Sequence, residues 1–233
     1  MSLVLLPTSI NFNNIPLLVS LLLLLSIYIT YFLYEIKPRF KKYIPNISET
    51  GVAYPNHVIF PIFMTLISIV FYFVAFYYLE YINYNGWIQG RSLYAFKIIA
   101  IILSIFLSLL SYCNLGDYYI IHNISAFLGF LAMIIITTKS VIVSNKFGDS
   151  FIFKFRLICL ILSFIGFVIM GIGFVFLNPR RATNAQSIGE ILFVVFLSII
   201  VSSFKYEFKE IKFNFAIEDD NDKQNNLLLD NED

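Results

Sequence analysis

Charged residues are scarce in this chain of 233 residues: Asp, Glu, Lys and Arg make up 13% of it, about half their share in an average soluble domain. The formal net charge of +1 gives no reason to expect a nucleic-acid partner, which would call for a clustered basic surface. Cysteine is almost absent, and Cys113 and Cys159 both lie inside apolar runs. This excludes a disulfide framework or a cysteine metal site and favours two small buried side chains.

Apolar residues are abundant instead: they make up 59% of the chain, and its mean hydropathy is +0.80. Runs of about 20 apolar residues cross a hydrocarbon core of about 30 Å when they are helical. The sequence therefore predicts an all-α, polytopic integral membrane protein built as a six-helix transmembrane bundle. The predicted helices are residues 15–36, 58–79, 93–112, 119–143, 153–177 and 188–204.

The ends of the chain are predicted to flank one membrane domain. Residues 1–14 form a short cytoplasmic N-terminus without a signal-peptide pattern, residues 15–212 the membrane domain, and residues 213–233 a disordered acidic cytoplasmic tail. Of the 16 Lys and Arg residues, ten fall on the side of the termini and six on the other side. The positive-inside rule then predicts that both termini are cytoplasmic.

A polar island separates the first two predicted helices. Proline fixes its two ends, glycine permits tight backbone conformations, and hydroxyl side chains can bond their own backbone, so we expect a folded turn. The motif residues of this turn are Ser48, Thr50, Gly51 and Pro55. The island also contains the sequon Asn46-Ile47-Ser48 on the predicted outer side, which makes Asn46 a glycosylation candidate.

Several ionisable residues are predicted to share one face of the membrane, because odd-numbered loops and the first turns of even-numbered helices lie on the same side. They are Glu49, His57, Asp117, His122, Arg180, Arg181 and Glu190. Charges at membrane depth usually face protein or water, which makes this face the candidate binding site. For Glu190, the alternative is a carboxylate that interacts with the dipole at the start of its own helix.

His122 is predicted to point into the bundle, because Ser125 and Gly129 follow it on a stripe of small residues that suits close packing. A similar stripe in the fifth predicted helix contains Ser163 and Gly166. His122 can shuttle protons or bind a metal together with a carboxylate, or its hydrogen bond can hold helices together. The sequence shows no catalytic motif and indicates no metal or cofactor.

Two arginines, Arg180 and Arg181, and a basic cluster at residues 37–42 flank predicted helices on this same face. They can anchor the helix ends by snorkelling. The alternative is that they bind a lipid headgroup that carries phosphate.

Three motif segments follow one another along the chain: Ser48-Glu49-Thr50-Gly51 with Pro55, the run from His122 to Leu128, and Ser187-Ile188-Gly189-Glu190 leading to Tyr206-Glu207-Phe208-Lys209. Together they resemble the DRAM family. This family comprises the damage-regulated autophagy modulators, and it is grouped with the Sfk-type, transmembrane-150 and post-GPI-attachment remodelling proteins. The resemblance implies a six-helix protein of lysosomes, endosomes or plasma membrane that promotes autophagy or regulates lipid signalling, with Glu49, His122 and Glu190 as the carried-over positions.

The leading interpretation is therefore a non-enzymatic membrane modulator whose outer face binds membrane lipids or a protein partner, while the cytoplasmic loops and tail recruit further proteins. An alternative is a lipid-remodelling enzyme or accessory factor with His122 as general base and Glu190 or Asp117 as its orienting carboxylate. A proton-coupled transporter is disfavoured, because no ionisable residue falls at the middle of a predicted helix.

Overall fold

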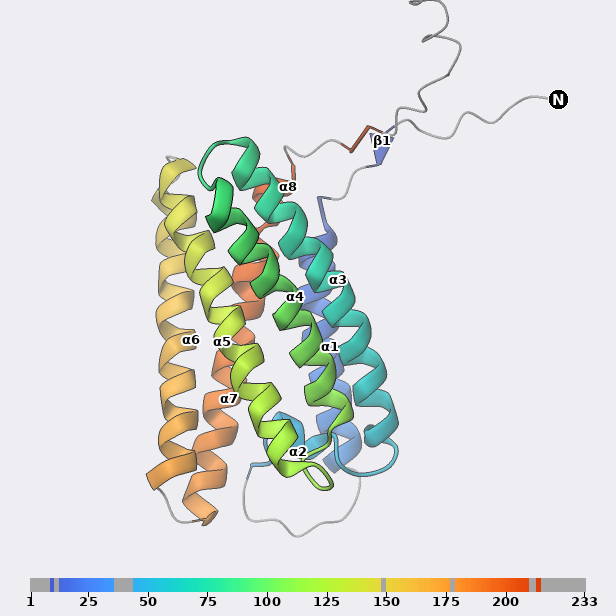
Figure 1. The fold of residues 1–233 in the computed structure, drawn as a ribbon. Coiled ribbons are helices and arrows are strands. Elements are labelled where there is room, and N and C mark those ends of the chain that lie inside the picture. Colours follow the sequence, from blue (N-terminus) through green and yellow to red (C-terminus); the bar gives the residue numbers. More distant parts are fainter. Residues whose placement is uncertain are drawn as a thin grey trace, which may run out of the picture.

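The computed structural model describes residues 9–10, 13–35, 44–147, 150–176, 179–209 and 213–214. Within these residues, six helices are long and apolar enough to cross a membrane (Figure 1). They are α1 (Ile15–Glu35), α3 (Asn56–Tyr84), α4 (Gly90–Tyr112), α5 (Tyr119–Ser144), α6 (Ser150–Phe176) and α7 (Pro179–Ser203). The predicted all-α membrane fold is confirmed.

Short elements connect or extend these helices. A four-residue helix, α2 (Ile47–Thr50), lies in the first loop, and α8 (Lys205–Phe208) follows α7 after a turn at Phe204. A 3₁₀ turn, η1 (Asn145–Phe147), follows α5. The two-residue strands β1 (Ser9–Ile10) and β2 (Phe213–Asn214) pair antiparallel near the two ends of the chain. Most of the predicted N-terminal segment and residues 215–233 of the predicted tail lie outside the described residues.

The predicted start of the sixth helix was wrong. The helix α7 begins at Pro179, nine residues before Ile188, because hydropathy detects only the part of a helix that lies in hydrocarbon. Proline is well tolerated in a first helical turn, where its missing N–H would have no partner. As a result, Arg180 and Arg181 lie in the first turn of α7 and not in a loop.

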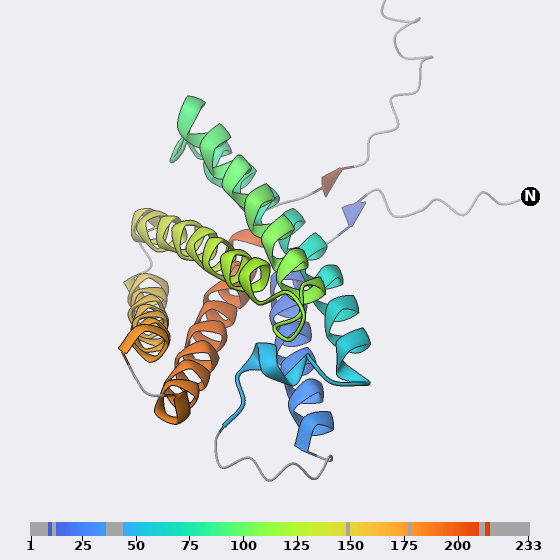
Figure 2. The same cartoon turned by 60° about the horizontal axis from the view of Figure 1, so that its bottom comes forward.

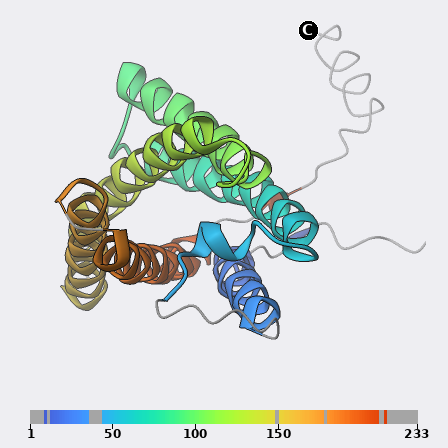
Figure 3. The same cartoon turned by 90° about the horizontal axis from the view of Figure 1, so that it is seen from below.

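The long helices follow one another around the bundle, and α7 returns to pack against α1. Figures 2 and 3 show the end of the bundle where α2 lies, with α2 inside the group of helix ends. It contacts α1 and α7. This arrangement brings the first loop and the last long helix together, although about 140 residues separate them in sequence.

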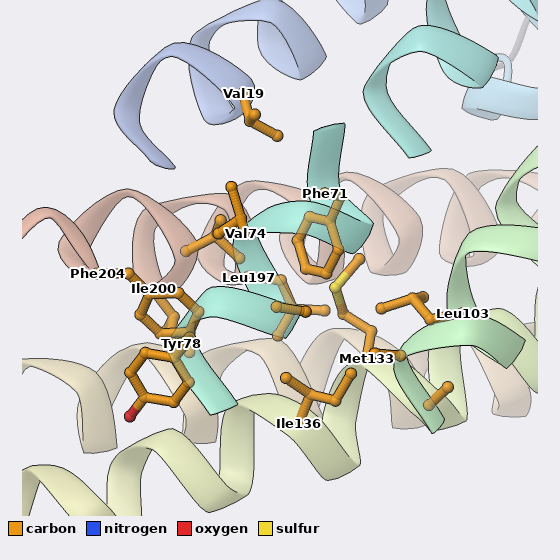
Figure 4. Close-up of a cluster of buried hydrophobic side chains, with 14 of the residues drawn as sticks. Val19, Phe71, Val74, Tyr78, Leu103, Met133, Ile136, Leu197, Ile200 and Phe204 are labelled. Atoms are coloured by element: carbon orange, nitrogen blue, oxygen red, sulfur yellow. The ribbon is translucent and has the colours of Figure 1, made fainter. Parts of the chain in front are cut away.

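The core is apolar and aromatic through the middle of the bundle. Phe71 of α3, Met133 of α5 and Leu197 of α7 converge in Figure 4, and Tyr78 stacks on Phe204 with 4.3 Å between ring centroids. Large hydrophobic side chains also cover the outer surface, as a protein surrounded by lipid requires. Examples are Phe32, Phe73, Ile98, Phe127 and Ile161.

Two glycines allow α6 and α7 to approach closely. A Cβ atom added to Gly166 would lie 2.7 Å from the Gly189 carbonyl oxygen, and one added to Gly189 would lie 2.6 Å from the Gly166 carbonyl oxygen. Only residues without a Cβ fit this contact, as at other close helix crossings in lipid. The predicted packing stripe through Ser163 and Gly166 is confirmed.

Candidate functional site

Residues 44–56, which we call the cap, fold over one end of the bundle. The side chain of Asn46 begins α2 by accepting a hydrogen bond from the Glu49 amide at 2.6 Å, a typical N-cap interaction. The Thr50 hydroxyl donates to the Ile47 carbonyl at 2.7 Å. A Cβ on Gly51 would lie 2.9 Å from the Phe60 ring. The predicted folded turn is confirmed, and it contains a helical turn that the sequence did not indicate.

Buried hydrogen bonds tie the cap to α1 and α3. The Asn56 amide group donates to the carbonyls of Thr30 and Thr50, both at 2.8 Å, and the two threonine hydroxyls lie 3.3 Å apart. All three residues are almost completely buried. The Tyr31 hydroxyl donates to the Pro45 carbonyl at 2.5 Å. These contacts give the cap a defined position on the bundle.

The carboxylate of Glu190 ties the cap to α7. One oxygen accepts from the Ile47 amide at 2.7 Å, and the other accepts from the Ser48 hydroxyl at 3.3 Å. Nearby, the Ser187 hydroxyl donates to the Ile44 carbonyl at 2.7 Å. The predicted outer face therefore brings the Ser-Glu-Thr-Gly loop and Glu190 together.

Glu190 does not lie in the first turn of its own helix, which was the alternative considered for it. It is the twelfth residue of α7, counted from Pro179, so it is too far from that helix's N-terminus to serve as its first-turn charge. It lies instead at the N-terminus of α2, whose free N–H groups need acceptors. Glu190 is 7% exposed, and a buried carboxylate requires such donors.

A cavity of about 50 Å³ lies beneath the cap, compared with the roughly 10–15 Å³ that one water molecule needs. Its walls are almost entirely hydrocarbon, contributed by α1, α3, α4, α5 and α7. Ser20 and Ser198 also line it, but their hydroxyls donate to carbonyls of their own helices at 2.9 and 2.7 Å. Ser48 and Glu190 are therefore the polar residues that line this cavity where it meets the cap.

His122 and Asp117 shape the turn between α4 and α5. His122 is 3% exposed, and its Nδ1 lies 2.7 Å from the Cys113 carbonyl oxygen. Asp117 exchanges two hydrogen bonds of 2.8 Å with Asn114. Among the described residues, no hydrogen bond joins His122 to Glu190 or Asp117. The inward orientation predicted for His122 is confirmed, and its contact fits a hydrogen bond that holds two helices together.

The small-residue stripe that follows His122 packs as predicted. Ser125 is buried, and a Cβ on Gly129 would lie 3.6 Å from the Phe106 side chain on α4. Pro55 lies at the start of α3, as the N-cap residue of that helix.

The remaining predicted residues lie around the cap. Glu49 is partly buried, and the Tyr34 hydroxyl lies 3.5 Å from its carboxylate. His57 is exposed beside Tyr54, with ring centroids 5.7 Å apart. The side chains of Arg180 and Arg181 and the basic cluster at 37–42 fall outside the described part of the chain, so the headgroup site stays a prediction. Glycosylation of Asn46 also stays a prediction.

At the other end of the bundle, a buried ion pair joins α6 to α8. The Arg156 guanidinium contacts both carboxylate oxygens of Glu207, at 2.5 and 2.8 Å, and donates to the hydroxyl and carbonyl of Ser203 at 2.7 and 3.0 Å. Arg156 is completely buried, Glu207 is 3% exposed, and the Phe204 ring centroid lies 5.4 Å from the guanidinium carbon.

This pair was not predicted from the sequence, where Arg156 is one of the ten Lys and Arg residues assigned to the side of the termini. A signal was present, because Arg156, Cys159, Ser163 and Gly166 follow helical spacing and all four are buried. An arginine in line with a packing stripe indicates a buried partner. Ser203 and Glu207, four residues apart, are that partner set.

A known protein family is similar to this chain over most of its length. The family model described as Frag1/DRAM/Sfk1/Cwh43P N-terminal domain matches residues 11–211, which is most of the chain. No curated protein and no solved structure matches it. Among the described residues, no three His, Cys, Asp or Glu side chains gather as a metal site would require.

Proposed function

The chain belongs to the Frag1/DRAM/Sfk1/Cwh43P family, and from this premise we propose that it is a non-enzymatic membrane protein that binds a lipid at its cap. Through that binding it modulates autophagy, lysosomal function or lipid signalling. Its cytoplasmic loops and tail recruit protein partners. The proposal applies to the face on which the cap, Glu49 and Glu190 lie.

The position of Glu190 carries this proposal. Its carboxylate accepts hydrogen bonds from the cap and also lines the apolar cavity beneath. Ionisable groups at membrane depth are costly and commonly mark a functional site. A polar group at one end of a hydrocarbon-lined space matches the amphipathic character of a lipid, which supports lipid binding over a purely structural role.

The test is lipid co-purification. Wild type, Glu190→Gln and the control Glu80→Gln are extracted in mild detergent, and bound lipids are identified by mass spectrometry. Glu80 lies on α3 towards the opposite end of the bundle, so the control removes the same charge away from the cap. We expect one lipid class to be enriched in wild type and control and to be depleted in Glu190→Gln.

Bulk lipid in equal amounts in all three proteins would contradict the proposal. It would assign the cap a structural role and direct the search to protein partners. If the lipid site acts in autophagy, wild type should restore autophagic flux to cells that lack the protein, and a folded Glu190→Gln variant should not.

The proposed location is the lysosomal, endosomal or plasma membrane, with both termini in the cytoplasm and the cap on the outer or lumenal side. The charge distribution between the loops supports this orientation. An N-linked glycan at Asn46 that disappears in Asn46→Gln, together with a C-terminal tag digested only after permeabilisation, would agree with it. A tag that is digested in intact cells would contradict it.

Lipid remodelling with His122 as general base is the second candidate. Its Nδ1 is engaged by the Cys113 carbonyl, so Nε2 would have to serve the substrate. A folded His122→Ala variant would then lose turnover of the co-purified lipid, and retained turnover would contradict this candidate.

A further inference from the structure

The cavity beneath the cap extends about as deep as one membrane leaflet. Glu190 and Val201 both line it, and they are eleven residues apart on α7, which at 1.5 Å per residue is about 16 Å. This is about half of a 30 Å hydrocarbon core. The α7 residues on its wall follow helical spacing and are Glu190, Phe193, Val194, Leu197, Ser198 and Val201.

The apolar walls of the cavity determine whether water or hydrocarbon fills it. Apolar cavities without polar partners stay free of water, and the serine hydroxyls deep in the wall, as at Ser198, are already bonded to their own helix. In a membrane, the available apolar material is hydrocarbon chain. A cavity one leaflet deep matches one such chain with its polar end at the cap.

The carboxylate of Glu190 determines which polar group of a lipid could bind at this end of the cavity. A carboxylate is an acceptor with about four lone-pair sites. The described hydrogen-bond donors to Glu190 are the Ile47 amide and the Ser48 hydroxyl, which leaves capacity for another donor. In a diacyl glycerophospholipid, the ester groups beside the two chains only accept hydrogen bonds. The free glycerol hydroxyl of a monoacyl lipid lies directly beside its one chain and can donate a hydrogen bond at that level.

We propose that this cavity binds the chain of a single-chain amphiphile whose hydroxyl group donates a hydrogen bond to Glu190. The inference rests on the proposed lipid-binding function and specifies the ligand class for that site. The shared chemistry is one hydrocarbon chain with an adjacent hydroxyl. Monoacyl glycerophospholipids and long-chain amino alcohols both present it.

The test uses lysophosphatidylcholine with a photoreactive diazirine in the middle of its chain, added to the full-length protein in lipid nanodiscs. Labelled peptides are mapped by mass spectrometry. We expect saturable label on cavity residues around Phe193–Val201, and excess unlabelled lysophosphatidylcholine should remove it. The analogue that lacks the free hydroxyl should compete about tenfold more weakly, as expected for loss of a hydrogen bond to a charged acceptor.

Competition also distinguishes the two classes of ligand, monoacyl glycerophospholipids and long-chain amino alcohols. Unlabelled sphingosine is titrated against unlabelled lysophosphatidylcholine, and the compound that displaces the probe at the lower concentration is assigned as the better match. Failure of both to displace label from the cavity would overturn the inference.

Variants provide an independent readout. Val194→Phe fills the cavity and should abolish the saturable label, whereas Val168→Phe, at a position on α6 that is 41% exposed, should not. In Glu190→Gln, lysophosphatidylcholine and its analogue without the hydroxyl should compete within about threefold of each other, because a hydrogen bond from the hydroxyl to a neutral acceptor contributes less binding free energy. Glu80→Gln should keep the difference of about tenfold between these two compounds.

Label confined to outward-facing residues such as Ile158 and Ile161, with unchanged labelling in Val194→Phe, would overturn the inference. If a lipid class still co-purifies in that case, the proposed lipid-binding function stands and only the cavity assignment falls. If no lipid class is enriched by co-purification either, both fall.

Discussion

Removing one partner of the buried ion pair should destabilise the protein far more than removing both. We consider Arg156→Met, Glu207→Met and the double variant, because methionine approximates the length of each side chain and adapts to irregular spaces. In Glu207→Met, the guanidinium keeps only its two bonds to Ser203 and stays buried without a countercharge.

The expected magnitudes follow from burial. Leaving one buried charge unpaired costs about 3–5 kcal/mol, while replacing both partners by apolar side chains is often neutral or stabilising. Because Arg156 is fully buried and Glu207 nearly so, each single variant should lose about 3–5 kcal/mol. The double variant should lie within about 1–2 kcal/mol of wild type, so the coupling energy should be several kcal/mol.

The assay is equilibrium or thermal unfolding in mild detergent, followed through the tertiary structure. The control is the ion pair between Lys97 and Glu80, whose side chains are 24% and 39% exposed. Glu80→Met should cost about 0.2–1 kcal/mol. The reasoning would be refuted if the single variants at Arg156 and Glu207 behaved like this control, or if the double variant lost the sum of the two single effects.

Three further predictions concern packing and the cap. Gly189→Ala should lower the free energy of unfolding by about 1–3 kcal/mol or more through overpacking. The control Gly171→Ala, where an added Cβ meets nothing within 4 Å, should raise it by up to about 1 kcal/mol through helix propensity. Unfolding midpoints test this, and equal midpoints in the two variants would contradict the close contact. Asn56→Leu should lower the free energy of unfolding by about 1–3 kcal/mol, because two buried carbonyls lose their hydrogen-bond donor. It should also speed protease cleavage within residues 44–56. An unchanged cleavage rate would argue that Asn56 does not hold the cap on the bundle. Asn46→Ala should weaken the cap by about 1 kcal/mol while Asn46→Asp keeps the N-cap acceptor, and the same cleavage assay should separate the two variants.

The helices were predictable because each is encoded by local composition. Long apolar runs identified all six spans, and the prolines and glycine of the first loop indicated a folded turn. The start of α7 at Pro179 was not predictable from hydropathy, because its first turns are polar. The same limitation hid the true neighbour of Glu190, which lies at the N-terminus of α2 and not of its own helix.

The contacts of the site depend on helix order, which hydropathy does not encode. The alternation of loops and helix starts placed Glu49, His122 and Glu190 on one face of the membrane, but it did not indicate which of these residues are in contact. The structure joins Glu190 to Ile47 and Ser48 and ties His122 to Cys113. The cavity depends on side chains from several helices, so no single segment could indicate it.

The buried pair also sets a condition on how the chain is made. Arg156 is translated 51 residues before Glu207, so α6 emerges with a cation whose countercharge does not yet exist. Until α7 and α8 follow, the long arginine side chain must reach to the headgroup region, as snorkelling permits. The contact between Arg156 and Glu207 can then form only after Glu207 leaves the ribosome. A chain truncated before Glu207 would keep an unneutralised charge at the membrane, a mark by which quality control could distinguish it from finished protein.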